Sequence, residues 1–186
     1  LHKAIRRQRQ MCIRDRSEDA LKKETYEKII GLLGSKKAIP IIIDIFGKIL
    51  TVLTALLYFV EIGWLVVSRE YKLVAGLIIV PAVFFVLLSK FREKINAKRP
   101  YELYGFKPLI NKNTKGLSFP SRHVFSIFVI GGSIWVINKI LGTVILVMGL
   151  FLAVIRVITG VHFPKDVAAG AVIGFVCSMA MFIFLI

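Results

Sequence analysis

The segment Arg156–Asp166, RVITGVHFPKD, places three groups that can do chemistry at the border of two apolar runs. Arg156 ends the first run, and His162 and Asp166 precede the second. A charged side chain near the centre of a membrane helix costs about 2.5–3.5 kcal/mol, so residues this costly indicate a site. His162 and Asp166 are four residues apart, a spacing at which a carboxylate can fix the tautomer of an imidazole that acts as a nucleophile.

A second polar cluster, Phe119–His123 (FPSRH), stands immediately before another apolar run. Ser121 is placed to cap the helix that this run predicts, and His123 falls in its first turn. The free N–H groups and the positive end of the helix dipole would then point at an anion bound there. This cluster predicts an anion site with an imidazole beside it.

A third cluster, Arg92–Pro100 (REKINAKRP), contains two arginines seven residues apart. Two helical turns separate Arg92 from Arg99, so both are expected on one face of a helix that ends near Pro100. Two guanidiniums on one face form a planar set of donors that suits phosphate oxygens. The alternative to a phosphate site is a set of basic residues that face water or bind lipid headgroups. If this cluster stood alone, that alternative would be favoured.

The elements that must position these clusters are membrane-spanning helices. The chain has 186 residues, 56% of them hydrophobic, and its apolar blocks are near twenty residues long, enough to cross a bilayer. We predict an all-α, polytopic membrane helical bundle with about five transmembrane helices, located in the cell membrane. The predicted spans are Pro40–Val67, Leu73–Ser89, Phe119–Asn138, Ile140–Ile158 and Val167–Ile186. Gly170, Gly174 and Ser178 form a small-residue stripe that favours close helix packing over a catalytic role.

The N-terminal part of the chain divides into two segments. Residues 1–16, LHKAIRRQRQMCIRDR, match one reading frame of a sequencing-library adapter, so we predict that they are not native; a genuine basic leader is the alternative. Removing their six Lys/Arg and one Asp changes the formal charge from +15 to +10. Residues 17–37 predict an amphipathic helix on the membrane surface, with a solvated helix as the alternative. Residues 38–186 form the predicted membrane-embedded domain.

Connectivity places the three clusters together. Arg92–Pro100 and Phe119–His123 flank one polar connection, and Arg156–Asp166 follows two spans later, so all three clusters fall on the same membrane face. The spacing resembles the signature of the type-2 phosphatidic acid phosphatase family, K-x6-RP, PSGH and SR-x5-H-x3-D. Here the matching residues are Arg92-x6-Arg99-Pro100, Pro120-Ser121-Arg122-His123 and Ile155-Arg156-x5-His162-x3-Asp166. This resemblance covers essentially all of Ser17–Ile186.

The resemblance implies a role for each matching residue. His162 would attack phosphorus, His123 would protonate the leaving oxygen, and Asp166 would orient His162. The phosphate would be bound by Arg92, Arg99 and Arg156 with help from Ser121. Three departures from the signature bear on substrate preference: Arg92 replaces lysine, Ile155 replaces serine, and Arg122 replaces glycine, where it could crowd the backbone or add a phosphate contact.

The function expected from these residues is metal-independent hydrolysis of a lipid-linked phosphate or diphosphate through a phosphohistidine. Preformed donors stabilise the charge of a phosphoryl group in flight, and three arginines would repel a divalent cation, so neither a metal nor a cofactor is expected. Undecaprenyl diphosphate, phosphatidylglycerol phosphate and phosphatidate are the substrate types that the resemblance implies. The expected partners are the lipid phosphate and membrane lipids, not nucleic acid.

Two other functions stay open. A lipid phosphotransferase would pass the phosphoryl group to another lipid, and a non-catalytic binder or transporter would only hold or move the lipid phosphate. Transporters more often carry polar residues and broken helices in the middle of their spans. The orientation also has two readings, because the N-terminal lysines favour a cytoplasmic site, whereas the family resemblance favours an outward one, which we prefer.

Overall fold

The structure is a computed structural model, and it describes residues 23–186. The predicted adapter segment 1–16 lies outside these residues. The described chain begins with a helix over residues 23–34. It continues through α2 (Ala38–Val67), α3 (Tyr71–Ile95), α4 (Pro100–Tyr104), α5 (Arg122–Ile137), α6 (Lys139–Ile158), α7 (Pro164–Ser178) and the 3-10 helix η1 (Met179–Phe184). The all-α prediction is therefore confirmed for the described part of the chain.

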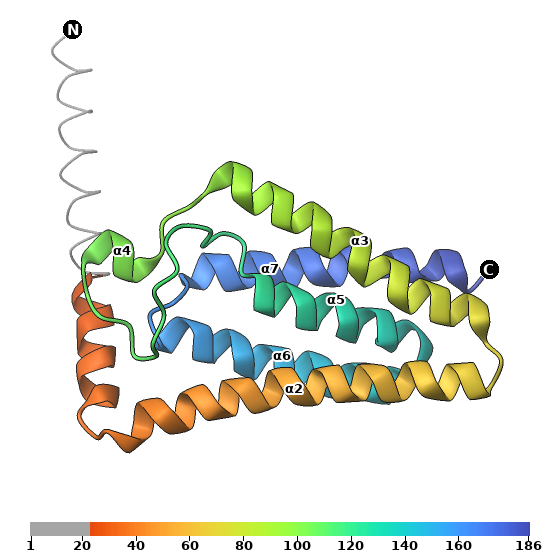
Figure 1. Ribbon diagram of the computed structural model, residues 1–186, viewed down its shortest axis with the longest axis horizontal. Coiled ribbons are helices and arrows are strands. Elements are labelled where there is room, and N and C mark those ends of the chain that lie inside the picture. The colour runs from red at the N-terminus through yellow and green to blue at the C-terminus, as the bar shows by residue number, and fades with distance from the viewer. Residues whose placement is uncertain (1–22) are drawn as a thin grey trace, which may run out of the picture.

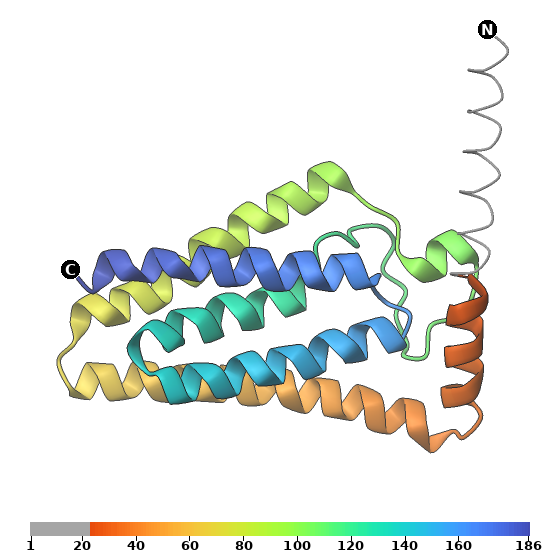
Figure 2. The ribbon, with the colours of Figure 1, turned by 180° about the vertical axis from the view of Figure 1, so that it is seen from behind.

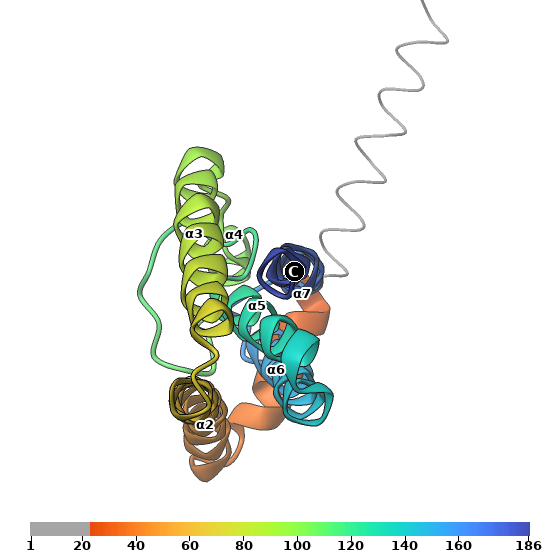
Figure 3. The same cartoon turned by 90° about the vertical axis from the view of Figure 1, so that its right-hand side faces the viewer.

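Five helices, α2, α3, α5, α6 and α7, run side by side along the long axis of the bundle (Figures 1 and 2). Of these five helices, α5 is the second shortest, with 16 residues. It nevertheless contacts all the others, α2, α3, α6 and α7. Its side chains Val124, Phe125 and Ile134 have no exposed surface. Seen end-on, α5 lies between α3, α6 and α7 (Figure 3). The bundle is thus built around the helix that carries His123.

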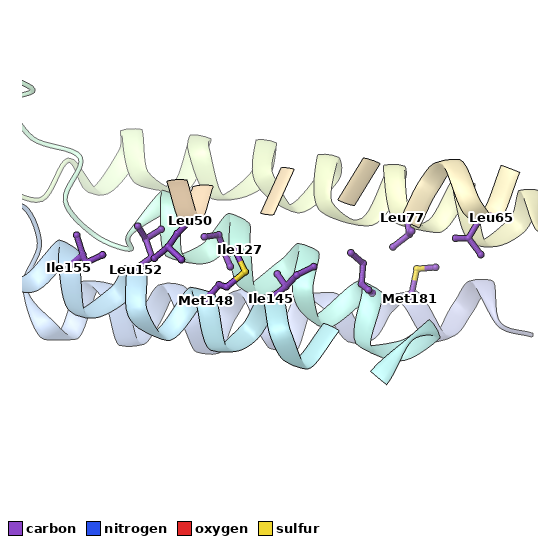
Figure 4. Close-up of a cluster of buried hydrophobic side chains, with 10 residues drawn as sticks. Leu50, Leu65, Leu77, Ile127, Ile145, Met148, Leu152, Ile155 and Met181 are labelled. Atoms are coloured by element: carbon purple, nitrogen blue, oxygen red, sulfur yellow. The ribbon is translucent and has the colours of Figure 1, made fainter. Parts of the chain in front are cut away.

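The hydrophobic core fills the space between α5 and its neighbours. Its largest cluster takes side chains from five elements, as Figure 4 shows, and includes Leu50, Leu77, Ile127, Ile145, Leu152 and Met181. Packing of this kind against several helices at once holds the first turn of α5 in place. Large apolar side chains on the outer face of α2, such as Ile42, Phe59 and Val60, stay more than half exposed. In a membrane protein such a face meets lipid.

The small-residue stripe of α7 packs against α5, as predicted. A Cβ atom added to Gly170 would lie 2.7 Å from the carbonyl oxygen of Ser121, and one added to Gly174 would lie 2.7 Å from that of Phe125. Backbone atoms cannot move aside as a flexible side chain can. The two helices therefore approach closely because glycine leaves room, and this approach brings the start of α7 beside the start of α5.

Within residues 23–186, four helices are long and apolar enough to cross a membrane, namely those that include α2, α3, α6 and α7 with η1, whereas α5 is apolar but shorter. The chain is a multi-pass membrane protein. The second span is longer than predicted, because α3 runs on through Pro81 to Ile95. It ends there because Asn96 takes a left-handed conformation, with φ of 43°. Arg99 consequently does not share a helix with Arg92, and that prediction was wrong.

One end of the bundle carries the polar segments. The helix over residues 23–34, α4 and the connection 105–121 all gather there, and the N-terminal helix crosses the bundle end rather than running along it (Figure 1). Helices α2 and α3 are joined at the opposite end and separate toward this one, where the connection 105–121 passes between them (Figures 1 and 3). The prediction that residues 17–37 lie on a membrane surface stays a prediction.

Candidate active site

A cavity of about 100 Å³ at this end of the bundle, here called the reaction cavity, collects most of the predicted site residues. Six of the eight line it: Arg92, Arg99, Arg122, His123, Arg156 and His162. The other two, Ser121 and Asp166, are buried behind it, with exposed fractions of 0% and 1%. Helices α3, α5 and α6 and the two connections at their ends therefore converge as the sequence predicted.

His162 is held between a carboxylate and a hydroxyl. Its Nδ1 lies 3.6 Å from Oδ2 of Asp166 and 3.4 Å from Oγ of Ser118. The Ser118 hydroxyl donates to the same carboxylate oxygen, and the backbone N–H of Phe163 donates to it at 3.1 Å. These donors fix the carboxylate, which faces Nδ1 of the imidazole and leaves Nε2 for a substrate in the cavity. His162 itself precedes α7, whose first residue is Pro164.

Backbone hydrogen bonds tie the two histidine segments together. The N–H of Ser121 donates to the carbonyl of Asp166 at 2.8 Å, and the N–H of His162 donates to the carbonyl of Arg156 at 3.1 Å. The first bond joins the start of α5 to the start of α7. The position of His123 relative to His162 is thus set by the close packing of these two helices.

Arg92 and Arg99 are both buried and both bind backbone carbonyls of the connection before α5. Arg92 donates to the carbonyls of Leu117 and Pro120. Arg99 donates from Nε to the carbonyl of Gly116 at 2.9 Å, with a longer contact to Val161 at 3.4 Å. A guanidinium has five N–H donors, so each arginine can hold the loop and still face the cavity. Part of their role is therefore to shape the loop that carries Ser118.

Three buried polar atoms of the predicted site residues have no hydrogen-bond partner among the described residues: the donors Oγ of Ser121 and Nε of Arg156, and the acceptor Oδ1 of Asp166. Ser121 takes the predicted N-cap position of α5, but its side chain makes no capping bond there. Buried polar groups are usually paired, because an unmet donor or acceptor costs about 1–3 kcal/mol. Unpaired donors beside a cationic cavity are what a site for an anion would provide.

His123 and Arg122 begin α5 at the edge of the cavity that faces α2 and α3. His123 is half-buried, whereas Arg122 is exposed and its guanidinium lies 5.7 Å from the centre of the Phe85 ring. Arg122 therefore points away from the backbone and does not crowd it. Of the two effects expected where Arg122 replaces glycine, crowding of the backbone is therefore excluded. The added contact with a phosphate stays a prediction.

A tyrosine from the N-terminal helix supports the His162 segment from behind. Tyr26 is 7% exposed, and its hydroxyl donates to the carbonyl of His162 at 3.2 Å. Its ring stacks on Phe106 with centroids 5.6 Å apart and meets Phe163 edge-on at 6.2 Å. Burial, followed by the nearby charge of Asp166, raises the pKa of Tyr26 to about 12. The hydroxyl therefore stays protonated and remains a donor.

The charge around the cavity favours an anion and a neutral nucleophile. Burial lowers the pKa of His162 to about 4, and the positive charges of Arg99 and Arg156 add to that shift, while Asp166 opposes it. His162 is consequently uncharged near neutral pH and keeps a free lone pair. Among residues 23–186, no group of three or more His, Cys, Asp or Glu side chains is arranged to hold a metal ion.

Three residues at the site were not predicted from the sequence: Ser118, Tyr26 and Lys112. Ser118 lies in an irregular loop, Tyr26 is 136 residues from its partner, and Lys112 is one lysine among several in a basic connection. Lys112 lines the reaction cavity. Ser118 directly precedes the Phe119–His123 cluster, but its position there does not indicate a contact with Asp166. No helical period or short spacing connects Tyr26 or Lys112 to the three clusters, so pattern reasoning had no signal for these two.

The fold and the site define a polytopic helical membrane protein whose cationic pocket lies where its spans end. A family model described as the PAP2 superfamily matches residues 71–185, which include all eight predicted site residues. The chain belongs to the PAP2 superfamily, and the sequence-based family resemblance is confirmed.

Similar proteins agree with this assignment. The bacitracin transport permease protein BcrC of Bacillus licheniformis is 30% identical over 134 residues, which are 68% of this chain and 65% of BcrC. Aquifex aeolicus LpxE has a similar structure, with a TM-score of 0.64 and 22% identity over 86% of this chain and 93% of LpxE. A PAP2-type phosphatidylglycerolphosphate phosphatase from Bacillus subtilis covers 88% of this chain and 94% of its own, with a TM-score of 0.50 and 17% identity. At these identities the two structures show a shared fold.

Proposed function

We propose that this protein is a membrane phosphatase that hydrolyses a lipid-linked phosphate or diphosphate through a phosphohistidine on His162. The observation that carries the proposal is the arrangement around one cavity of a neutral His162 backed by Asp166, a second histidine, and three buried or half-buried arginines. Arginines and unpaired side-chain donors such as Oγ of Ser121 suit the equatorial oxygens of a phosphoryl group, whose charge they stabilise without rearranging.

The proposed reaction has two steps. In the first, Nε2 of His162 attacks phosphorus, the bond from phosphorus to the lipid oxygen breaks, and His123 gives its proton to that oxygen. In the second, water attacks the phosphohistidine, His123 takes a proton from the water, and the P–N bond breaks to release phosphate. Asp166 stabilises the charge and tautomer of His162 throughout, as the acid of a catalytic triad does.

Access for a lipid is provided by a cleft between α2, α3 and α5, here called the lipid-side cleft. Its walls include Thr51, Ala55, Phe85 and Ile130, and His123 stands at its inner end. A lipid chain lying in this cleft would bring its phosphate to the reaction cavity while its apolar part stayed beside the membrane. The name of one solved relative, a phosphatidylglycerolphosphate phosphatase, adds support for lipid phosphates as a class.

Transport is a second candidate, and the observation that favours it is the similarity to BcrC, which is named a bacitracin transport permease protein. A lipid phosphotransferase is the third, because it would share the phosphohistidine. Purified protein should be incubated with a prenyl diphosphate, phosphatidylglycerol phosphate or phosphatidate, and both free phosphate and labelled lipid should be followed. Phosphate release that His162→Ala abolishes supports hydrolysis, whereas label passed to another lipid indicates the phosphotransferase.

The same assay tests the requirement for a metal. Release should continue in a chelator and should be inhibited by vanadate, which mimics five-coordinate phosphorus. Loss of release in the chelator that one divalent metal restores would contradict the proposed mechanism. No release from any of the lipids, with binding retained, would favour the transporter.

A further inference from the structure

A second cavity, of about 400 Å³, adjoins the reaction cavity on the far side of His123. It lies between the N-terminal half of α2, the connection 105–121 and the C-terminal end of α6. Its polar lining residues are Asp44, Lys48, Thr51, Asn111, Lys112, His123 and Arg156. We call it the lysine cavity, and the two-step reaction described above does not use it.

The charges in the lysine cavity leave a net attraction for an anion. Lys48 and Asp44 form an ion pair 2.7 Å long, so they largely neutralise each other. Lys112 and Arg156 face the same space, and Nε of Arg156 is buried with no partner among the described residues. Lys112 is half-buried, and burial and the charge of Arg156 lower its pKa while Asp44 raises it. Two cationic groups therefore meet in a cavity where one carboxylate is already paired.

The position of this cavity matches the path of a leaving group. His123, the proposed proton donor to the leaving oxygen, lines the reaction cavity, the lysine cavity and the lipid-side cleft. Thr51 lines both the lysine cavity and the lipid-side cleft, so these two spaces are neighbours. An ester of a simple lipid alcohol would need only the reaction cavity and the cleft. A leaving group with its own charge would have the lysine cavity beside it.

We propose that the lysine cavity binds a second phosphate, carried by the leaving group, and that Lys112 is its principal contact. This inference rests on the proposed function and names the substrates that it favours, which are lipids with two phosphates. In a prenyl diphosphate, the second phosphate is joined to the attacked phosphate by an anhydride oxygen. In phosphatidylglycerol phosphate, a glycerol joins the two phosphates. In both, breaking the bond to the attacked phosphorus leaves a phosphate-bearing lipid whose charge Lys112 stabilises.

The test compares two-phosphate lipids with a reference substrate whose leaving group has no phosphate. Purified protein would be assayed on a prenyl diphosphate, on phosphatidylglycerol phosphate and on an aryl phosphate. The variants are Lys112→Gln, which removes the charge, and Lys112→Arg, which keeps it. Lys115→Gln is the matched control, because Lys115 is exposed on the same connection and lines neither cavity. Turnover of the aryl phosphate also reports that each variant is folded.

Lys112→Gln should lower kcat/KM on the two-phosphate lipids about 10-fold to 100-fold relative to the aryl phosphate, the size expected for one charge-assisted hydrogen bond. Lys112→Arg should recover part of this loss, and Lys115→Gln should show none. A selective loss on only one of the two lipids identifies which linkage the cavity accepts.

Three results would overturn the inference. They are an equal loss on all three substrates, no loss on either lipid, and a wild-type enzyme that turns over the aryl phosphate but neither two-phosphate lipid. The first would assign Lys112 to the reaction cavity alone. A wild-type protein that releases phosphate from none of the three substrates would instead contradict the proposed function.

Discussion

The hydroxyl of Tyr26 donates a hydrogen bond to the backbone carbonyl of His162, across 136 residues of sequence. The contact joins the N-terminal helix to the segment that carries the proposed nucleophile. It holds the backbone of His162 through a side chain that belongs to another helix. The helix over residues 23–34 is therefore part of the structure that positions the site, although it contributes no residue to the lining of the reaction cavity.

Tyr26→Phe should lower kcat about 3-fold to 10-fold with little change in KM, because it removes one hydrogen bond of about 0.5–1.5 kcal/mol and keeps the ring. Tyr58→Phe is the matched control. Tyr58 also donates to a backbone carbonyl, that of Leu77, at 2.8 Å, but far from the site. Both variants should lose similar thermal stability, and only Tyr26→Phe should lose turnover. Equal turnover in the two would show that the Tyr26 contact is merely structural.

Asp166→Asn should lower the rate by orders of magnitude with little change in apparent substrate affinity, since it disturbs the nucleophile more than the phosphate cradle. It should also move the acid limb of the pH–rate profile. His162 attacks as the neutral base, so activity falls as the pH drops through its pKa of about 4. Asp166 raises that pKa, so removing its charge should shift the limb to lower pH.

The pH profile of kcat/KM for the wild type and Asp166→Asn, measured on one substrate, checks this prediction. Titration of the substrate is common to both proteins and cancels in the comparison. A limb that stays in place, or a rate close to that of the wild type, would mean that Asp166 acts only on the local fold.

His123→Ala should separate the two steps of the proposed reaction. An aryl phosphate has an acidic leaving phenol that hardly needs a proton, so the first step should survive. The second step should fail, because His123 must then activate water. Rapid mixing should show a burst of about one phenol per enzyme, as one-to-one formation of a phosphoenzyme requires, followed by a stall. His162→Ala should show no burst, and the reverse result would exchange the roles of the two histidines.

Gly170→Ala should reduce both thermal stability and turnover. Its new methyl group would press on the carbonyl of Ser121 at 2.7 Å and separate α7 from α5. The hydrogen bond from Ser121 to Asp166 would then lengthen, and the two histidines would move apart. Gly63→Ala is the control, because nothing lies within 4 Å of a Cβ there. It should leave turnover unchanged and raise helix stability by up to about 1 kcal/mol. Wild-type turnover in Gly170→Ala would contradict the packing account.

The sequence by itself determined the membrane helices and the residues that meet at one end of them. Apolar blocks of spanning length give the helices directly, because only such segments satisfy the backbone within a bilayer. The number of spans between the clusters then decides that Arg92, His123 and His162 share a face. The four-residue spacing of His162 and Asp166 likewise predicted their contact, since it depends on little more than local chain geometry.

Only the tertiary structure decided what surrounds these residues. The left-handed Asn96 ends α3 before Arg99, a local conformation that the seven-residue spacing did not reveal. Ser118, Tyr26 and Lys112 reach the site through loops and helices whose paths depend on how the whole bundle packs. Tyr26 binds a backbone carbonyl, which every residue has, so its partner leaves no trace in the sequence. Contacts of this kind have no period along the chain, and they exist only once α5 and α7 have come together at Gly170 and Gly174.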